Sequence, residues 1–386
     1  MTTACLAPNG MNVYCGKEPA DRLLVGTAKG VAVLERAAGK DWSQTGTALE
    51  GSHISSMVIE PVHGGTYAGV HRGGVFFSPD GGRSWEPRGE GISIPHVYSM
   101  TYAVEQGRPF LYAGTEPPCV FRSRDEGRSW DELPGWRDMK GKEKWLFPMP
   151  PHLPHAKTMA VDPRDPHVLY VGVEQAGLFK TTDGGQSWRE LEAYSRPDDE
   201  SYRDIHQCVL RPGHPDEVYI TTGMGLYRSK DGGESWDHLT ERNSFRIGYP
   251  DKLIFSPADD RTIFICGSHA NPGTWISLHT ANAAVMVSRD CGKSWALASH
   301  GMPDPMTANL EAMCLYSSGD GFDLFAGTTD GKVYFSEDGA QSWRLIASDL
   351  APVSKVEHYR LLLPGAVSSR GNRPPGVGHA AAQPGR

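Results

Sequence analysis

An eight-residue pattern that recurs six times constrains the fold of this chain more than any other feature of its sequence. Each copy reads Ser or Thr, any residue, Asp, any residue, Gly, two further residues and Trp, and the last copy has Ala in place of Gly. These residues predict a tight hairpin turn, because Asp accepts backbone N–H bonds, Gly takes positive φ, and Trp packs back between neighbouring sheets. The copies are SPDGGRSW (78–85), SRDEGRSW (123–130), TTDGGQSW (181–188), SKDGGESW (229–236), SRDCGKSW (288–295) and SEDGAQSW (336–343).

Alternating apolar strands, such as GVFFS, GLFKT and GLYRS, precede these turns. Successive tryptophans of the pattern lie between 45 and 59 residues apart, which leaves room for four strands in each unit. A seventh, degenerate copy at LERAAGKDW (34–42) retains Gly39 and Trp42 but lacks the Ser and Asp of the pattern. The spacing therefore predicts seven four-stranded units.

The repeated turn resembles the Asp-box, or bacterial neuraminidase repeat, and the chain looks like an Asp-box β-propeller over residues 21–364. The phrases VDPRDPHVLYVG (161–172) and LRPGHPDEVYITT (210–222) also resemble this group, which includes sialidases, xyloglucanases, sortilin-type receptors and photosystem-assembly factors. The resemblance implies an all-β, seven-bladed propeller. It implies no particular activity, because the Asp-box is a structural turn.

Three regions are expected along the chain. Residues 1–20 are interpreted as an N-terminal extension, 21–365 as the propeller, and 366–386, which are rich in Gly, Pro and Ala, as a disordered tail. The first unit shows no clear inner strand before RLLVGTA. We therefore expect KVEHYRLLLP (355–364) to supply that strand and close the ring on the N-terminal blade.

Composition narrows the range of partners. A formal net charge of −8 argues against a nucleic-acid or anionic-membrane surface, and no run of 18 apolar residues predicts a transmembrane helix. The N-terminus lacks the charge and apolar pattern of a signal peptide. Seven cysteines at irregular spacings indicate free thiols in a reducing compartment, so we expect a cytoplasmic protein.

A histidine stands four residues before a methionine at the start of three inner strands: HISSM (53–57), HVYSM (96–100) and HAKTM (155–159). Stacking all inner strands on this register, with side chains alternating along each strand, predicts two positions that face the propeller axis. The first position holds His53, His96, His155, Asp204, Tyr249, Asn309 and Glu357. The second holds Ser55, Tyr98, Lys157, His206, Asp251, Glu311 and Tyr359.

The ends of the following strands are expected on the same face. Their third residues are His71, Glu116, Glu174, Gly223, His269, Thr329 and Ala28. Imidazole is the commonest metal ligand, and a nearby carboxylate usually orients it. We therefore expect a transition metal ion (Fe, Zn or Cu) held by histidines, with Glu116 and Glu174 orienting them. The expected ligands are His53, His96 and His155, followed by His206, His269 and His71.

Two long connections are expected to cover this face. Residues 136–154 carry Trp145 and Phe147, and residues 269–284 carry Trp275 and His279. A small organic substrate would lie beneath these loops. Lys157 is a candidate electrostatic group or general acid beside the metal.

Three functions remain open from the sequence. The leading one is a metal-dependent enzyme that activates water or dioxygen. The second is a metal-free glycoside hydrolase that uses the carboxylates of Asp204, Asp251, Glu311 and Glu357. The third is a non-enzymatic scaffold for binding or assembly. A metal-free, His-rich ligand pocket and a solvated channel wall are the alternative interpretations of the histidines themselves.

Overall fold

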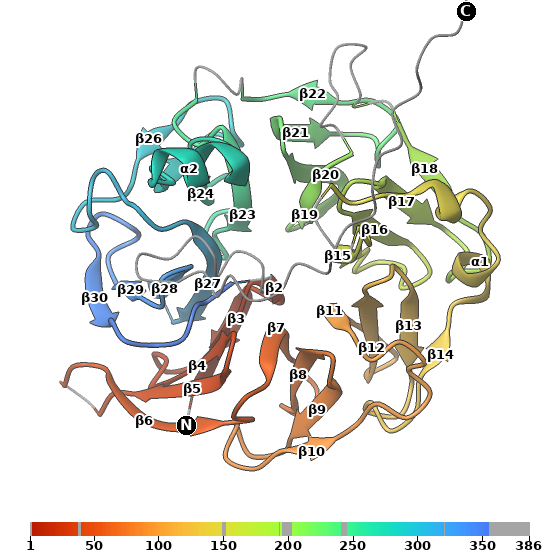
Figure 1. Ribbon diagram of the computed structural model, residues 1–386, viewed down its shortest axis with the longest axis horizontal. Coiled ribbons are helices and arrows are strands. Elements are labelled where there is room, and N and C mark those ends of the chain that lie inside the picture. Colours follow the sequence, from red (N-terminus) through yellow and green to blue (C-terminus); the bar gives the residue numbers. More distant parts are fainter. Residues whose placement is uncertain are drawn as a thin grey trace, which may run out of the picture.

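The computed structural model describes residues 2–37, 40–148, 152–192, 194, 203–240, 245–319 and 321–354. Seven sheets stand around a central axis, each with its inner strand beside the axis (Figure 1). The chain is thus an all-β, seven-bladed propeller, as the repeat predicts.

Four blades consist of four consecutive strands each. Blade 3 contains β11 (Val97–Glu105), β12 (Arg108–Thr115), β13 (Val120–Ser123) and β14 (Asp131–Glu132). Blade 4 contains β15 (Ala156–Val161), β16 (Leu169–Val173), β17 (Gly177–Thr181) and β18 (Arg189–Leu191). Blade 5 contains β19 (Ile205–Arg211), β20 (His214–Thr222), β21 (Gly225–Ser229) and β22 (Asp237–His238). Blade 6 contains β23 (Tyr249–Phe255), β24 (Ile263–Ser268), β25 (Ala284–Ser288) and β26 (Ala296–Leu297).

The other three blades each receive a strand from the N-terminal segment. Blade 1 is β1 (Thr3–Leu6), β4 (Arg22–Thr27), β5 (Gly30–Glu35) and β6 (Ser43–Ala48). Blade 2 is β2 (Asn9–Gly10), β7 (His53–Ile59), β8 (Thr66–His71), β9 (Gly74–Ser78) and β10 (Glu86–Pro87). Blade 7 is β3 (Val13–Gly16), β27 (Leu310–Ser318), β28 (Gly321–Thr328), β29 (Val333–Ser336) and β30 (Arg344–Ala347). Short helices α1 (Pro134–Arg137), η1 (Lys142–Lys144) and α2 (Pro272–Leu278) lie in connections.

The N-terminal segment corrects two expectations. Residues 3–6 pair in parallel with β4, so β1 occupies the inner position that was expected for residues 355–364. Strands β2 and β3 pair in parallel with β7 and β27 in the same way. The N-terminal segment is therefore part of the propeller rather than an extension to it. The sequence did not reveal this because short parallel strands carry no hairpin signal. Residues 355–386, including Glu357, Tyr359 and the expected tail, lie outside the described residues.

The repeated turns have the expected hydrogen bonds. In the third copy, Asp183 Oδ1 accepts bonds from Gln186 N at 2.9 Å and Ser187 N at 3.0 Å, while its Oδ2 accepts one from Ser187 Oγ at 2.6 Å. Thr181 Oγ1 donates to Asp183 Oδ1 at 2.7 Å and accepts Gly185 N at 3.0 Å. Gly185 has φ of 91°, which favours glycine. One aspartate thus holds the turn together.

All six strands β7, β11, β15, β19, β23 and β27 skip one residue near their N-terminal end, after the first paired residue in β11, β15, β19 and β27 and after the second in β7 and β23. In β15, for example, Ala156 pairs with Val173 and Thr158 pairs with Gly172, so the pairing with β16 skips Lys157. Such a bulge re-aims the side chain of the extra residue. The bulged residues are Ser55, Tyr98, Lys157, His206, Asp251 and Glu311, and all six side chains are buried.

Apolar side chains fill the spaces between neighbouring blades. Tyr67 of blade 2, for instance, packs in one cluster with Leu111, Phe121 and Trp130 of blade 3. All seven cysteines are free thiols. Within the described residues, none of the helices has the length and apolar character needed to cross a bilayer.

Candidate functional site

Polar side chains gather where the inner strands begin. His53 is the cross-strand partner of His71 in blade 2. In the next two blades the same pairing is made by backbone bonds, since Glu116 N donates to His96 O at 3.0 Å and Glu174 N donates to His155 O at 3.1 Å. The hairpin of each blade therefore places one residue from its inner strand beside one from its second strand.

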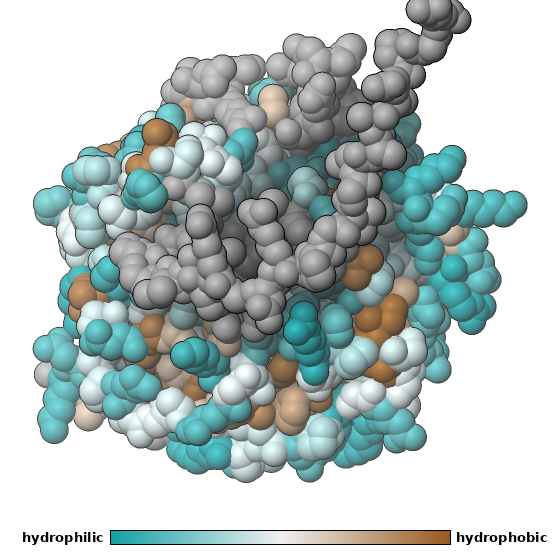
Figure 2. All heavy atoms as spheres, in the orientation of Figure 1, coloured by the Kyte–Doolittle hydropathy of each residue, from teal (hydrophilic) through white to brown (hydrophobic). Residues whose placement is uncertain are grey.

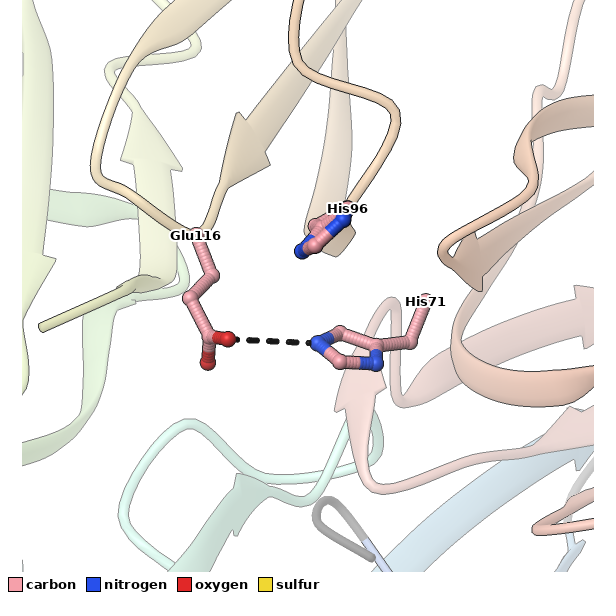
Figure 3. A group of neighbouring side chains, drawn as sticks. All are labelled: His71, His96 and Glu116. Atoms are coloured by element: carbon pink, nitrogen blue, oxygen red, sulfur yellow. Dashed lines mark hydrogen bonds and ion pairs between the residues drawn. The ribbon is translucent and has the colours of Figure 1, made fainter. Parts of the chain in front are cut away.

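His71, His96 and Glu116 form a group that could hold a metal ion, because one ligand atom from each lies within 4.8 Å of the others. Figure 3 shows the three side chains converging from blades 2 and 3, with His71 Nε2 3.4 Å from Glu116 Oε1. Glu116 is buried, whereas the two histidines are partly exposed. Their rings lie 5.1 Å apart, centroid to centroid. The group is thus open on its histidine side.

The protonation states of this group suit a cation. Burial opposes ionisation of Glu116, but hydrogen bonds with His155 and His71 lower its pKa to about 2, so it is a carboxylate near neutral pH. Burial and the neighbouring His71 and Arg72 lower the pKa of His96, which outweighs the opposite effect of Glu116. His96 Nδ1 is buried and makes no hydrogen bond among the described residues. A neutral imidazole and a charged carboxylate therefore share the site.

His155 lies beside Glu116 but is not one of the three residues of the first group. Its Nδ1 is 3.1 Å from Glu116 Oε2 and its Nε2 is 2.5 Å from Glu174 Oε2. Burial opposes the charged form, but the two carboxylates raise the pKa of His155. Both of its nitrogens face carboxylates, so this ring contacts Glu116 and Glu174 rather than the open side of the first group. It orients Glu116, which exchanges the roles expected for these two residues.

Aromatic rings hold His155 in place. Tyr98 stacks on it at 4.0 Å with 20° between the planes, and Phe147 packs at 4.9 Å. Phe147 is buried, so this residue of the long connection supports the site from within. Trp145 packs instead on Phe179, and Trp275 lies in a core cluster of blades 6 and 7.

A second group follows in blades 4 and 5. Glu174, Asp204 and His206 offer ligand atoms within 4.8 Å of one another, and all three are buried. Lys157 Nζ lies 2.5 Å from Glu174 Oε1, so this lysine is engaged by a carboxylate rather than presented to the first group. Tyr249 donates a hydrogen bond to Asp204 Oδ2 at 2.8 Å.

Two further carboxylates, those of Asp251 and Glu311, lie on the other side of the axis and accept hydrogen bonds from described residues. Asn309 Nδ2 donates to Asp251 Oδ2 at 2.9 Å, and Ser354 Oγ donates to Glu311 Oε2 at 2.9 Å. Both carboxylates are buried. Ser354 was not expected at the axis, and nothing in its sequence context signals this contact.

The remaining histidines lie outside the two groups. His53 Nε2 bonds to the carbonyl of Ser354 at 2.8 Å, although its ring is only 5.8 Å from that of His71. His269 is exposed, with Nδ1 3.2 Å from Arg246 O, and His279 is also exposed. Of the six expected ligands, the structure therefore places two, His71 and His96, in the first group and His206 in the second.

Comparisons with known proteins support the fold. No family model matches the chain, and no curated protein matches its sequence. Among solved structures, the chain is similar to the GH74 xyloglucanase of Xanthomonas campestris, with 17% identity, a TM-score of 0.54, and coverage of 77% of this chain and 45% of that one. An ancestral GH74 enzyme is 16% identical, with a TM-score of 0.58. The match covers 75% of this chain and 38% of that enzyme. YCF48 from Cyanidioschyzon merolae is 15% identical, with a TM-score of 0.51. The match covers 76% of this chain and 84% of YCF48.

These likenesses define a class of fold. The chain is a seven-bladed β-propeller. It spans less than half the length of the two GH74 enzymes.

Proposed function

We propose that this propeller is a metal-dependent enzyme whose ion is bound by His71, His96 and Glu116. The observation that supports it is the convergence of two imidazoles and one carboxylate, with ligand atoms within 4.8 Å of one another, at the start of blades 2 and 3. Two histidines and one carboxylate with further positions open are a donor set used by catalytic zinc and non-haem iron.

The separation of the ligand atoms fits a single ion. His71 Nε2 and Glu116 Oε1 are 3.4 Å apart. Two atoms at that separation, each about 2.1 Å from an ion, subtend roughly 110° at it, which suits tetrahedral coordination. Glu116 is already fixed by His155 at its other oxygen, as metal-bound carboxylates commonly are.

The chemistry follows from the open side of the group. A bound ion would lower the pKa of a coordinated water or polarise a substrate oxygen. The partly exposed rings of His71 and His96 leave that side accessible, while buried Glu116 closes the other. We therefore propose a small organic substrate and a hydrolytic or oxidative reaction with water or dioxygen.

The direct test is metal binding by protein purified without a chelator or a histidine tag. Zn²⁺ and Co²⁺ binding is measured by equilibrium dialysis with elemental analysis. We expect His96→Gln and Glu116→Gln each to weaken binding at this group by at least about 100-fold, because each removes one of three ligands. His269→Gln is the matched control, since that exposed histidine lies outside the group, and it should bind like the wild type.

Folded wild-type protein that takes up neither ion would refute this proposal. So would His96→Gln and Glu116→Gln variants that retain all wild-type binding. Circular dichroism of each variant distinguishes loss of ligands from loss of fold.

Glycoside hydrolysis is the second candidate, because two of the similar solved structures are GH74 enzymes, one of them a xyloglucanase. In this chain Asp251 and Glu311 would be the paired carboxylates of such a reaction. Asp251 accepts a hydrogen bond from Asn309 and Glu311 accepts one from Ser354, and these contacts fix the orientation of the two carboxylates.

Xyloglucan oligosaccharides and aryl glycosides test this candidate. Turnover that persists in EDTA and is lost in Asp251→Asn or Glu311→Gln, but is retained in His96→Gln, would favour the glycosidase over the metal enzyme. Turnover lost in EDTA and in His96→Gln would favour the metal.

A further inference from the structure

A second set of buried polar atoms lies next to the proposed metal site and is not used by it. It consists of Glu174, Asp204 and His206, which are 2%, 4% and 0% exposed. Their ligand atoms lie within 4.8 Å of one another. Burying two carboxylates beside an imidazole costs free energy unless a positive charge offsets them.

The orientation of His206 directs one nitrogen into this set. His206 Nδ1 is 2.6 Å from the carbonyl oxygen of Pro250. Because a carbonyl only accepts, Nδ1 donates to it, and Nε2 is therefore the nitrogen that faces the two carboxylates. That Nε2 is fully buried, makes no hydrogen bond among the described residues, and lies 3.3 Å from Asp204 Oδ2.

Either a proton on Nε2 or a cation between the two atoms makes this contact between the imidazole and the carboxylate favourable. Asp204 Oδ2 also accepts a hydrogen bond from Tyr249, and it retains a lone pair for a further contact. Asp204 Oδ1 is also buried and makes no hydrogen bond within the described part of the chain. Two buried polar atoms of this set, His206 Nε2 and Asp204 Oδ1, thus lack a hydrogen-bond partner among the described residues, which a bound cation would supply.

We infer that Glu174, Asp204 and His206 bind a second metal ion. The 3.3 Å between Nε2 and Oδ2 corresponds to roughly 105° at an ion about 2.1 Å from each atom, again suitable for tetrahedral coordination. A nitrogen ligand beside two carboxylates favours Zn²⁺, Fe²⁺ or Co²⁺ over Mg²⁺. The Pro250 carbonyl fixes the histidine tautomer, as the outer partner of a metal-bound histidine does.

His155 connects the two sites. It bridges Glu116 of the first group and Glu174 of the second, with its nitrogens 3.1 Å and 2.5 Å from the respective carboxylates. Lys157 also contacts Glu174. These two residues offset part of the negative charge of Glu174, while its oxygens retain lone pairs for a metal. The three ligands of the second site differ from those of the first, so a metal ion can bind at the second site whether or not the first is occupied.

The test is the stoichiometry of Zn²⁺ and Co²⁺ bound at equilibrium. We expect two equivalents in the wild type, and one each in His206→Gln and in His96→Gln. Asp204→Asn serves as a second variant of the same site, because it preserves shape and removes the charge. His269→Gln remains the control with two equivalents.

A measurement on the wild type does not depend on how the variants fold. In protein labelled with ¹⁵N-histidine, Zn²⁺ should shift the Nε2 resonance of His206 while Nδ1 remains protonated. If Zn²⁺ leaves that resonance unchanged and Nε2 is found protonated, His206 is an imidazolium paired with Asp204 and the second site is overturned.

The two proposals fail in different ways. Wild type with one equivalent that His96→Gln removes would overturn the second site and leave the first intact. Wild type with one equivalent that His206→Gln removes and His96→Gln retains would overturn the proposed catalytic metal and support the second site.

Discussion

His155 and Glu174 form an ion pair in the interior of the propeller, with Nε2 2.5 Å from Oε2 and both side chains nearly inaccessible to solvent. Lys157 reaches the other oxygen of the same carboxylate, also at 2.5 Å. The carboxylate of Glu174 therefore contacts both His155 and Lys157, while the other nitrogen of His155 lies beside Glu116.

Lys157→Met should destabilise the protein by about 3–5 kcal/mol, because removing one partner of a buried ion pair leaves the remaining charges poorly compensated. Urea unfolding followed by tryptophan fluorescence measures this loss. Arg137→Met removes an exposed pair with Asp138 and should leave the unfolding midpoint unchanged. Equal midpoints for Lys157→Met and wild type would show that the buried pair contributes nothing to stability.

Gln207 joins blades 5 and 6, since its Oε1 accepts a hydrogen bond from Leu253 N at 2.6 Å. In Gln207→Leu the buried Leu253 N–H loses its partner, which should cost about 1–3 kcal/mol. Gln44→Leu, on the exposed strand β6, is the matched control and should change stability by less than about 0.5 kcal/mol. The melting temperatures of both variants, measured by thermal unfolding, test this prediction. A similar loss of stability in the two variants would contradict the hydrogen bond between blades 5 and 6.

Leu6 tests the placement of the N-terminal strand. Its side chain is fully buried in the cluster that joins blades 1, 2 and 7. Leu6→Ala should therefore destabilise the propeller by about 2–5 kcal/mol, as deletions of buried leucine side chains do. Leu278, which is 64% exposed on α2, provides the control, and its replacement by Ala should have little effect. A Leu6→Ala variant as stable as wild type would mean that β1 does not form part of the ring.

Acid should weaken the repeated turns. Hydrogen bonds from Ser187 lower the pKa of Asp183 to about 2, against about 3.9 in an unfolded chain. Because the folded-state pKa is depressed, the contribution of this carboxylate is complete above the unfolded pKa and disappears as the pH falls through about 2. The stability advantage of wild type over Asp183→Asn should be constant above about pH 5 and shrink below pH 4.

Urea midpoints between pH 7 and pH 2.5 measure this advantage. Asp131→Asn, on the exposed residue of β14, should follow the wild-type profile. An advantage over Asp183→Asn that stays constant down to pH 2.5 would contradict the role assigned to the turn.

The sequence predicted the propeller because its signal is repeated and local. Each Ser/Thr–Asp–Gly–Trp turn is completed within eight residues, so its hydrogen bonds can be inferred without knowledge of the rest of the chain. The parallel strand β1 has no such local signal. It was missed because its partners, in β4, lie 19 positions further along the chain and no turn connects the two strands directly.

The site was predictable in position but not in detail. Alternation placed His96, His155 and Glu116 in one region, and the structure brings them there. Whether an imidazole faces a metal or a carboxylate depends on side-chain contacts between blades. His155 lies between two glutamates from different hairpins, and no spacing within one strand encodes that arrangement.

The bulge in each inner strand has a consequence for how such a protein can diversify. Because Ser55, Lys157 and Glu311 occupy ladder-free positions, a different side chain there leaves the pairing register of its blade unaltered. Six blades already carry a hydroxyl, a phenol, an ammonium, an imidazole and two carboxylates at this one position. The side chain at the bulge of each blade can therefore be replaced separately, by evolution or by design, and each replacement changes the functional groups that line the axis without changing the strand pairing.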